Sequence, residues 1–183
     1  MKPLVVCAAL LLATTGLFAQ KAPPKSPPAK ATASIGGHEI SITYSAPGVK
    51  GREGKIFTSD GLIKTSGGSQ YPIWRGGANA ATTLHTDADL MIGDLSLPKG
   101  DYTLFFDISD PDNWSLIVNK KTGEWGLAHD GAQDLGKTKM TMSKPPSMVE
   151  NLIYTITDNG GGKGTITLAW EDHSASVSVT AHK

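Results

Sequence analysis

The chain has 183 residues, of which 39% are hydrophobic and 19% are charged, so its composition allows one ordinary core and excludes disorder of the whole chain. Lys plus Arg and Asp plus Glu number 17 each, which leaves no basic excess to attract nucleic acid. The only cysteine, Cys7, lies in the first apolar run. We therefore expect no disulfide and no thiol chemistry in the rest of the chain.

Residues 1–19 have the pattern of a secretory signal peptide. Lys2 supplies a positive start, Leu4 to Leu12 form an apolar run, and Ala19 offers a small residue at a cleavage site. The apolar run is too short to cross a bilayer, which needs about 20 residues. We expect cleavage after Ala19, export to the periplasm or the extracellular space, and no transmembrane span in the mature protein.

Residues 20–33 contain four prolines and three lysines among small residues. A segment with so little apolar surface cannot offset the entropy lost on ordering, so we expect a disordered linker. The folded domain is expected over residues 34–183.

Period-two alternation dominates the rest of the chain. Ile40, Ile42 and Tyr44 alternate with polar residues, as in a half-buried strand. A short helix is expected near Leu62. Strands are expected at residues 82–87, 90–97, 102–108, 114–119, 124–127, 138–142, 149–157, 165–170 and 174–181. Strands 102–108 and 114–119 form a predicted hairpin, and Phe105 makes the first of them apolar on both faces.

Nine to eleven short strands with closely spaced turns indicate an all-β fold. We predict a single-domain antiparallel β-sandwich, jelly-roll or Greek-key-like. The clean alternation of the first and last strands indicates sheets with one solvated face.

Several short motifs resemble one bacterial family, the domain of unknown function DUF2911. They are Tyr44-Ser-Ala-Pro47, Lys50-Gly-Arg52, Trp74-Arg-Gly-Gly-Ala-Asn79, Leu97-Pro-Lys-Gly-Asp-Tyr-Thr-Leu-Phe105, Trp114 with Asn119-Lys120, and Trp125-Gly126. The resemblance covers residues 38–183 and implies an exported β-sandwich without an assigned activity. Two positions depart from the family: Ala46 stands where the family usually has Arg, and Ala80 where it usually has Glu.

The segment Trp74 to Asn79 is the first candidate site. Arg75 could hold a carboxylate, a phosphate or a sugar hydroxyl, Gly77 permits close approach of a ligand, and Asn79 offers both donors and acceptors. The same residues could instead stabilise a strained loop. Arg52 and the possible stacking residue Trp125 complete the candidate set.

Two other groups of titratable residues give weaker indications of a metal site or a catalytic site. His85, Asp87 and Asp89 are plausible metal ligands, but their sequence is more typical of a polar turn. We therefore expect no metal and no other cofactor. His129-Asp130 could be an acid–base pair, but no nucleophile motif accompanies it. The sequence favours a non-catalytic envelope module that binds a small molecule, a glycan or an envelope protein. The alternative is a hydrolase or lyase that acts on an envelope or extracellular polymer.

Overall fold

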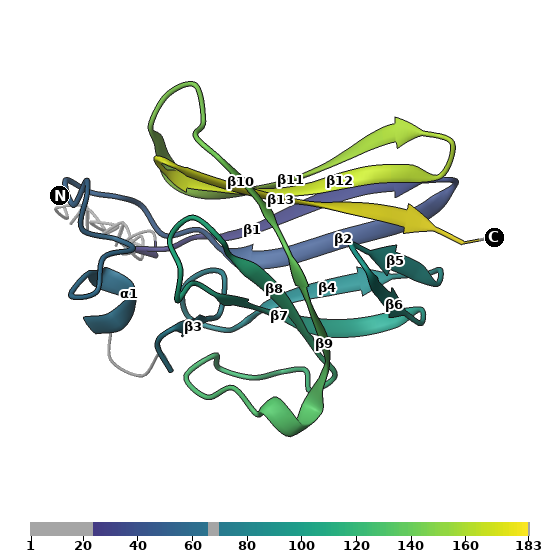
Figure 1. Ribbon diagram of the computed structural model, residues 1–183, viewed down its shortest axis with the longest axis horizontal. Coiled ribbons are helices and arrows are strands. Elements are labelled where there is room, and N and C mark those ends of the chain that lie inside the picture. Colours follow the sequence, from purple (N-terminus) through teal and green to yellow (C-terminus); the bar gives the residue numbers. More distant parts are fainter. Residues whose placement is uncertain (1–23, 66–69, 183) are drawn as a thin grey trace, which may run out of the picture.

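A computed structural model describes residues 24–65 and 70–182 and shows two packed antiparallel sheets (Figure 1). Helical structure is limited in this part of the chain to α1 (Leu62–Thr65) and a 3-10 turn, η1 (Gly131–Gln133). The predicted all-β sandwich and the predicted short helix are confirmed. The predicted signal peptide and the first residues of the predicted linker, 20–23, lie outside the described residues.

The first sheet has seven strands. In order across the sheet they are β1 (Pro28–Ile35), β2 (His38–Ser45), β4 (Thr82–Thr86), β7 (Gly100–Asp107), β8 (Ser115–Asn119) and β9 (Asp134–Lys139), with β3 (Ile73–Trp74) paired to one end of β7. Ile42 lies opposite Leu84, and Leu104 lies opposite Val118. All four are buried, so the register places one apolar row on the inner face.

The second sheet has six strands. In order they are β11 (Val149–Gly160), β12 (Lys163–Glu171), β13 (His173–Ala181), β5 (Leu90–Ile92) and β6 (Leu95–Leu97), with β10 (Thr141–Ser143) also paired to β13. β13 lies between β12 and β5. The strand predicted over residues 174–181 is therefore confirmed, and it lies inside a sheet.

The prediction of one continuous strand over residues 90–97 is wrong. The chain forms a tight hairpin there, in which Leu90 lies opposite Leu97 and Ile92 opposite Leu95. Gly93 has a φ of 58°, a left-handed conformation that glycine adopts without strain and that reverses the chain. Apolar residues stand on both sides of this short turn, which is why the sequence alone suggested one strand.

The domain also begins earlier than the predicted Ser34. Residues 28–33, assigned above to the linker, belong to β1 and pair with β2 from Pro28 opposite Ser45 onward. Pro28 is tolerated because it is the first residue of a strand at the edge of its sheet. Ala29, Ala31 and Ala33 are half-buried and pack against the core, and the polar residues between them are exposed. Alanine side chains carry too little apolar surface to reveal this alternation.

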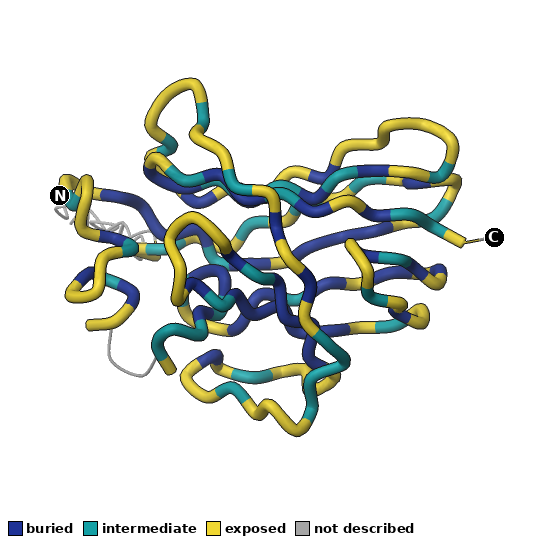
Figure 2. The backbone as a smooth tube through the Cα atoms, in the orientation of Figure 1, coloured by how far each residue is buried: buried dark blue, intermediate teal, exposed yellow. Residues whose placement is uncertain are grey.

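The main core fills the space between the sheets, where Figure 2 shows buried backbone along both layers. Three tryptophans, Trp74, Trp114 and Trp170, are at most 3% exposed and meet around Phe57. A smaller cluster of Ala81, Phe105 and Ile117 forms a separate group. Phe105 alternates with inward-facing neighbours, so this cluster occupies the outer face of the first sheet.

The segment between β8 and η1 contacts this outer cluster. The predicted strand over 124–127 is absent; the segment is irregular, and Gly123 and Gly126 both have left-handed φ angles. The Ala81 N–H donates to the Glu124 carbonyl (3.0 Å), and the His129 ring lies 4.9 Å from that of Phe105. These contacts give Phe105 the cover on its second face that the sequence predicted.

Among the described residues, no helix has the length and apolar character needed to cross a membrane.

Candidate functional site

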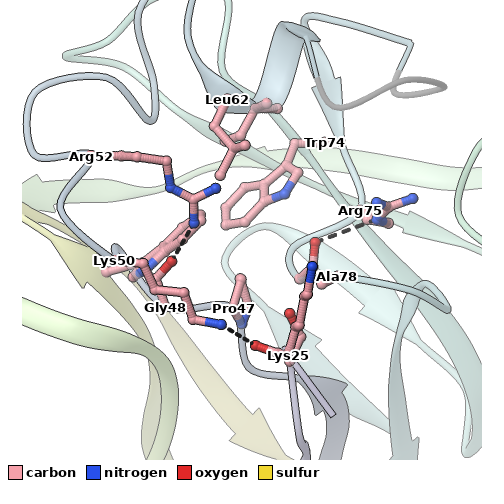
Figure 3. Close-up of a pocket in the computed structure, with 13 residues that line it drawn as sticks. Lys25, Pro47, Gly48, Lys50, Arg52, Leu62, Trp74, Arg75 and Ala78 are labelled. Carbon is pink, nitrogen blue, oxygen red and sulfur yellow. Dashed lines mark hydrogen bonds between the residues drawn. The ribbon is translucent and has the colours of Figure 1, made fainter.

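Trp74 and Arg75 point to opposite faces of the chain, as predicted for neighbours on extended backbone. Trp74 ends β3 opposite Phe106 and is 3% exposed. Its ring stacks on Trp170, with 6.0 Å between centroids and 20° between planes. Figure 3 shows Trp74 among the residues that line a pocket, whereas the Arg75 head group points away from it. Trp74 therefore anchors the loop in the core, and Arg75 lies at the margin of the pocket.

Gly76 is fixed by a buried hydrogen-bond network. Its carbonyl accepts hydrogen bonds from the Tyr154 hydroxyl (2.7 Å) and from Oγ1 of Thr82 (3.1 Å). Burial raises the pKa of Tyr154 well above its usual value, so the hydroxyl remains a donor. Gly76 has a φ of 66°, and a Cβ on it would lie 2.4 Å from both the Phe106 ring and the Tyr154 oxygen. Only glycine fits here, and the reason is packing.

The contacts of Arg75 favour the interpretation that it stabilises the loop, and they are made to backbone carbonyls rather than to a carboxylate. Its Nε donates to the Gly77 carbonyl and its Nη1 to the Gly126 carbonyl, both at 3.4 Å. A Cβ on Gly126 would lie 2.5 Å from Cδ of Arg75, so the arginine stem passes directly over that glycine. Burial lowers the pKa of Arg75. The side chain thus connects the 74–79 loop to the segment that covers the outer face.

Gly77 and Asn79 connect the same loop to the start of β1 and the end of β2. The Ala78 N–H donates to the Ser45 carbonyl (3.1 Å), and a Cβ on Gly77 would come within 3.0 Å of that oxygen. Asn79 is exposed, has a φ of 60°, and donates from Nδ2 to the Ser26 carbonyl at 3.5 Å. Both residues therefore help to hold the loop against the first described residues of the chain.

A pocket of about 520 Å³ lies beside this loop. Arg52, Arg75 and Gly77 of the candidate set line it, whereas Asn79 and Trp125 do not. Trp125 is 61% exposed and belongs to the segment that covers the outer face. Apolar side chains make up much of the lining: Pro47, Leu62, Ile63, Trp74, Ala78 and Trp170.

The charged side chains that line the pocket are all basic. They are Lys25, Lys50, Arg52 and Arg75. Within the described chain, none of the four lies within ion-pair distance of a carboxylate, although three other lysines do. The carboxylate of Glu150 accepts the backbone N–H of Lys50 (3.0 Å) and does not line the pocket. The lining therefore carries four basic groups without an ion pair among the described residues.

Backbone carbonyls hold the basic groups in place. Arg52 donates from Nε to the Val49 carbonyl (2.8 Å) and from Nη2 to the Gly48 carbonyl (2.7 Å). Lys50 donates from Nζ to the Lys25 carbonyl (2.6 Å). The segment that carries them is itself fastened to β11, because the Val49 N–H donates to the Glu150 carbonyl (2.8 Å). The charges are thus positioned by a fixed backbone.

Trp170 contributes a second unusual feature. Its side chain lines the pocket and is 1% exposed, and its indole Nε1 is buried without a hydrogen-bond partner among the described residues. Buried donors in folded proteins are nearly always paired. The Trp170 indole N–H is therefore an unpaired buried donor in a residue that lines the pocket.

Arg52, Arg75 and Gly77 were predicted site residues, and Trp74 and Ala78 lay within the predicted segment, but the other lining residues were not predicted. Lys25 lay in the predicted linker, and Leu62 and Trp170 are separated from that segment in the sequence. Of the two departures from the family pattern, Ala46 is buried beside Pro47, and Ala80 is exposed. No local motif could have brought these residues together, because the pocket arises only when the two sheets pack.

A group of metal-ligand type occurs at the turn between β12 and β13, where no metal was expected. Glu171, Asp172 and His173 place ligand atoms within 4.8 Å of one another. Each also has a structural contact: the Glu171 carboxylate accepts the Gly54 N–H, and Nδ1 of His173 lies 2.6 Å from Asp172. The His173 ring stacks on Trp114, with 15° between planes. The contact between Glu171 and Gly54 fastens the turn to the 52–57 segment.

The predicted pair His129-Asp130 does not form. His129 instead approaches Asp134 through Nε2 at 2.8 Å, and Asp130 caps η1 by accepting the Ala132 N–H. His85 pairs with Asp101, Asp87 lies near His38, and Asp89 accepts the Lys99 N–H (2.8 Å), so the three residues considered as metal ligands have separate partners. None of these pairs belongs to the described lining of the pocket.

Replacement of Glu171 by Gln is expected to change the pH dependence of stability. Burial, the largest cause, raises the pKa of Glu171. The unfolded state therefore ionises first as pH rises, and the contribution of this group to stability is largest below the ordinary carboxyl pKa and lost as pH rises to the raised value. Glu171→Gln keeps an acceptor for Gly54 but does not titrate. Its stability relative to the wild type should increase as the pH rises above the ordinary carboxyl pKa of about 4, measured by denaturant unfolding; a constant difference would contradict this account.

Comparison with known proteins supports one assignment. A family model described as "Protein of unknown function (DUF2911)" matches residues 26–179. No curated protein and no solved structure matches the chain. The match begins close to the first described residues and ends within β13, so it includes both sheets and every residue that lines the pocket except Lys25. The chain belongs to the DUF2911 family.

Proposed function

We propose that this protein is an exported envelope component that binds a small anionic molecule in the 520 Å³ pocket and does not transform it. The observation that carries the proposal is the set of four basic side chains around one pocket, with no carboxylate partner among the described residues. Uncompensated charge of this kind attracts an anion and favours its binding over that of a neutral molecule.

The size and composition of the pocket agree with a small-molecule ligand. Such sites typically enclose about 300–1,000 Å³ and combine an apolar lining with a few placed polar groups. Arg52 is held by two carbonyls, so little side-chain entropy is lost when its head group meets a ligand. Among the described residues, the lining contains no carboxylate and no histidine for general acid–base catalysis, which favours binding over turnover.

The binding proposal is tested by thermal unfolding in the presence of acetate, phosphate, citrate or hexanoate, with chloride at equal ionic strength as reference. At least one of these anions should raise the melting temperature of the wild type, because a ligand at a hundred times its Kd stabilises a fold by about 2.7 kcal/mol. Lys25→Ala/Lys50→Ala should lose most of that increase.

Lys99→Ala/Lys120→Ala is the matched control, because it removes the same charge from exposed positions outside the pocket. It should retain the response to the anion. No response of the wild type to any of the four anions, or equal responses of the two double variants, would show that the pocket is not an anion site.

The export proposal has a separate test. Residues 1–19 should be removed on secretion, so mass spectrometry of the mature protein should find Gln20 at its N-terminus. A mature chain that still carries Met1 would contradict export by this signal, whatever the binding experiments show.

A further inference from the structure

The basic and the apolar residues occupy different sides of the pocket. Figure 3 shows Lys25, Lys50 and Gly48 toward one side and Leu62 with Trp74 toward the other, with Arg52 reaching between them. Pro47 and Ala78 add apolar surface to the lining. A ligand that fills the whole pocket must therefore offer both an anionic group and an apolar surface, because a polar group placed against the apolar side would be left unpaired.

Only part of the positive charge is available inside the pocket. Arg75 directs its head group to carbonyls at the margin, and Lys50 already donates to the Lys25 carbonyl. Two nitrogens of Arg52 are engaged by carbonyls, and its Nη1 has no described partner. The interior thus presents the free end of one guanidinium, with lysines at its side. This arrangement suits a single negative group better than a multiply charged one.

We infer that the ligand is an amphipathic organic carboxylate, with one acid group toward Arg52 and Lys50 and an apolar body against Leu62 and Trp74. This inference rests on the anion-binding function proposed above and adds the class of the ligand. The carboxylate accepts from Nη1 of Arg52, a charge-assisted hydrogen bond of the stronger type. The apolar body displaces water from the Leu62 and Trp74 surface, which strengthens binding in proportion to the area covered.

A homologous series of carboxylates tests the inference on the wild-type protein. Binding of acetate, butanoate and hexanoate is followed by tryptophan fluorescence, since Trp74 and Trp170 both line the pocket. Kd should fall about threefold for each added methylene, as expected for partial burial of a CH₂ group. Inorganic phosphate and hexylamine complete the set: phosphate should bind more weakly than hexanoate, and hexylamine should not bind.

Equal affinities for acetate and hexanoate, or tighter binding of phosphate than of hexanoate, would overturn the inference and leave the anion-binding proposal intact. Failure of every anion to bind would overturn both. Binding of hexylamine as tightly as hexanoate would show that the apolar surface alone selects the ligand, which also contradicts the inference.

A pair of leucine variants locates the apolar side. Leu62→Ala should weaken hexanoate binding several-fold and leave acetate binding unchanged, because only the longer chain reaches this wall. Leu127→Ala is the matched control; Leu127 is 40% exposed, lies outside the pocket, and its loss should change neither affinity. An equal loss of acetate and hexanoate binding in Leu62→Ala would assign the residue a structural role and overturn the placement of the apolar body. The wild-type series decides the ligand class even if Leu62→Ala does not fold.

Discussion

Val177→Asp is expected to lower the free energy of unfolding by about 4 kcal/mol or more, because it buries a carboxylate without a partner. Val177 is 4% exposed on β13, opposite Ile166 of β12, and belongs to the main core. β13 has paired neighbours on both sides, so the strand cannot turn to expose the new charge without breaking both sets of hydrogen bonds.

Urea unfolding followed by circular dichroism measures this loss. Ser178→Asp is the matched control, because Ser178 is the next residue, is exposed and projects from the other face of the same strand. Its effect should stay within about 0.5 kcal/mol. If Val177→Asp unfolds at the same denaturant concentration as the wild type, the register described for β12 and β13 is wrong.

Trp74→Ala is expected to cost about 3–5 kcal/mol, the usual range for truncation of a buried aromatic residue. The Trp74 ring has aromatic neighbours on several sides: Phe57 at 5.6 Å, Phe106 at 5.7 Å, Trp170 at 6.0 Å and Trp114 at 6.1 Å between centroids. These residues come from both sheets and from the loop after β2. Collapse of the cavity is therefore opposed from every side, which places the expected loss toward the upper end of the range.

Trp125→Ala provides the comparison for the same change of side chain. Trp125 is 61% exposed, so its truncation should alter the free energy of unfolding by no more than about 0.5 kcal/mol. Similar losses of unfolding free energy in the two variants would show that packing in the aromatic cluster around Trp74 contributes no special stability to the fold. Both variants can be compared by the denaturant midpoint at unchanged slope.

Strands that carry large apolar residues could be predicted from the sequence. Ile40, Ile42 and Tyr44 mark β2, and Ala175, Val177 and Val179 mark β13, because each alternation puts bulky groups on one face. β1 escaped prediction because its inward residues are alanines. The turn at Gly93 escaped because apolar residues flank it on both sides. The local sequence pattern thus shows which face of a strand is buried, but it does not reveal every turn of the chain.

The candidate site was predictable only in part, and for a similar reason. Arg52, Arg75 and Gly77 stand in unusual local contexts, and all three line the pocket. Lys25 and Trp170 have ordinary local contexts and enter the pocket only through long-range packing. Asn79 and Trp125 were sensible candidates by residue type, yet the structure places one on the loop surface and the other on the outer face of the first sheet.

The pocket walls come from both ends of the described chain. Lys25 and Ser26 precede the first strand, whereas Trp170 belongs to the penultimate strand, and the Lys25 carbonyl is held by Lys50. A growing polypeptide cannot complete this cavity until almost the whole domain has been synthesised. Ligand binding should therefore require a completely folded domain. A protease that cleaves the chain just before β1 would remove one wall of the pocket while every strand stays paired.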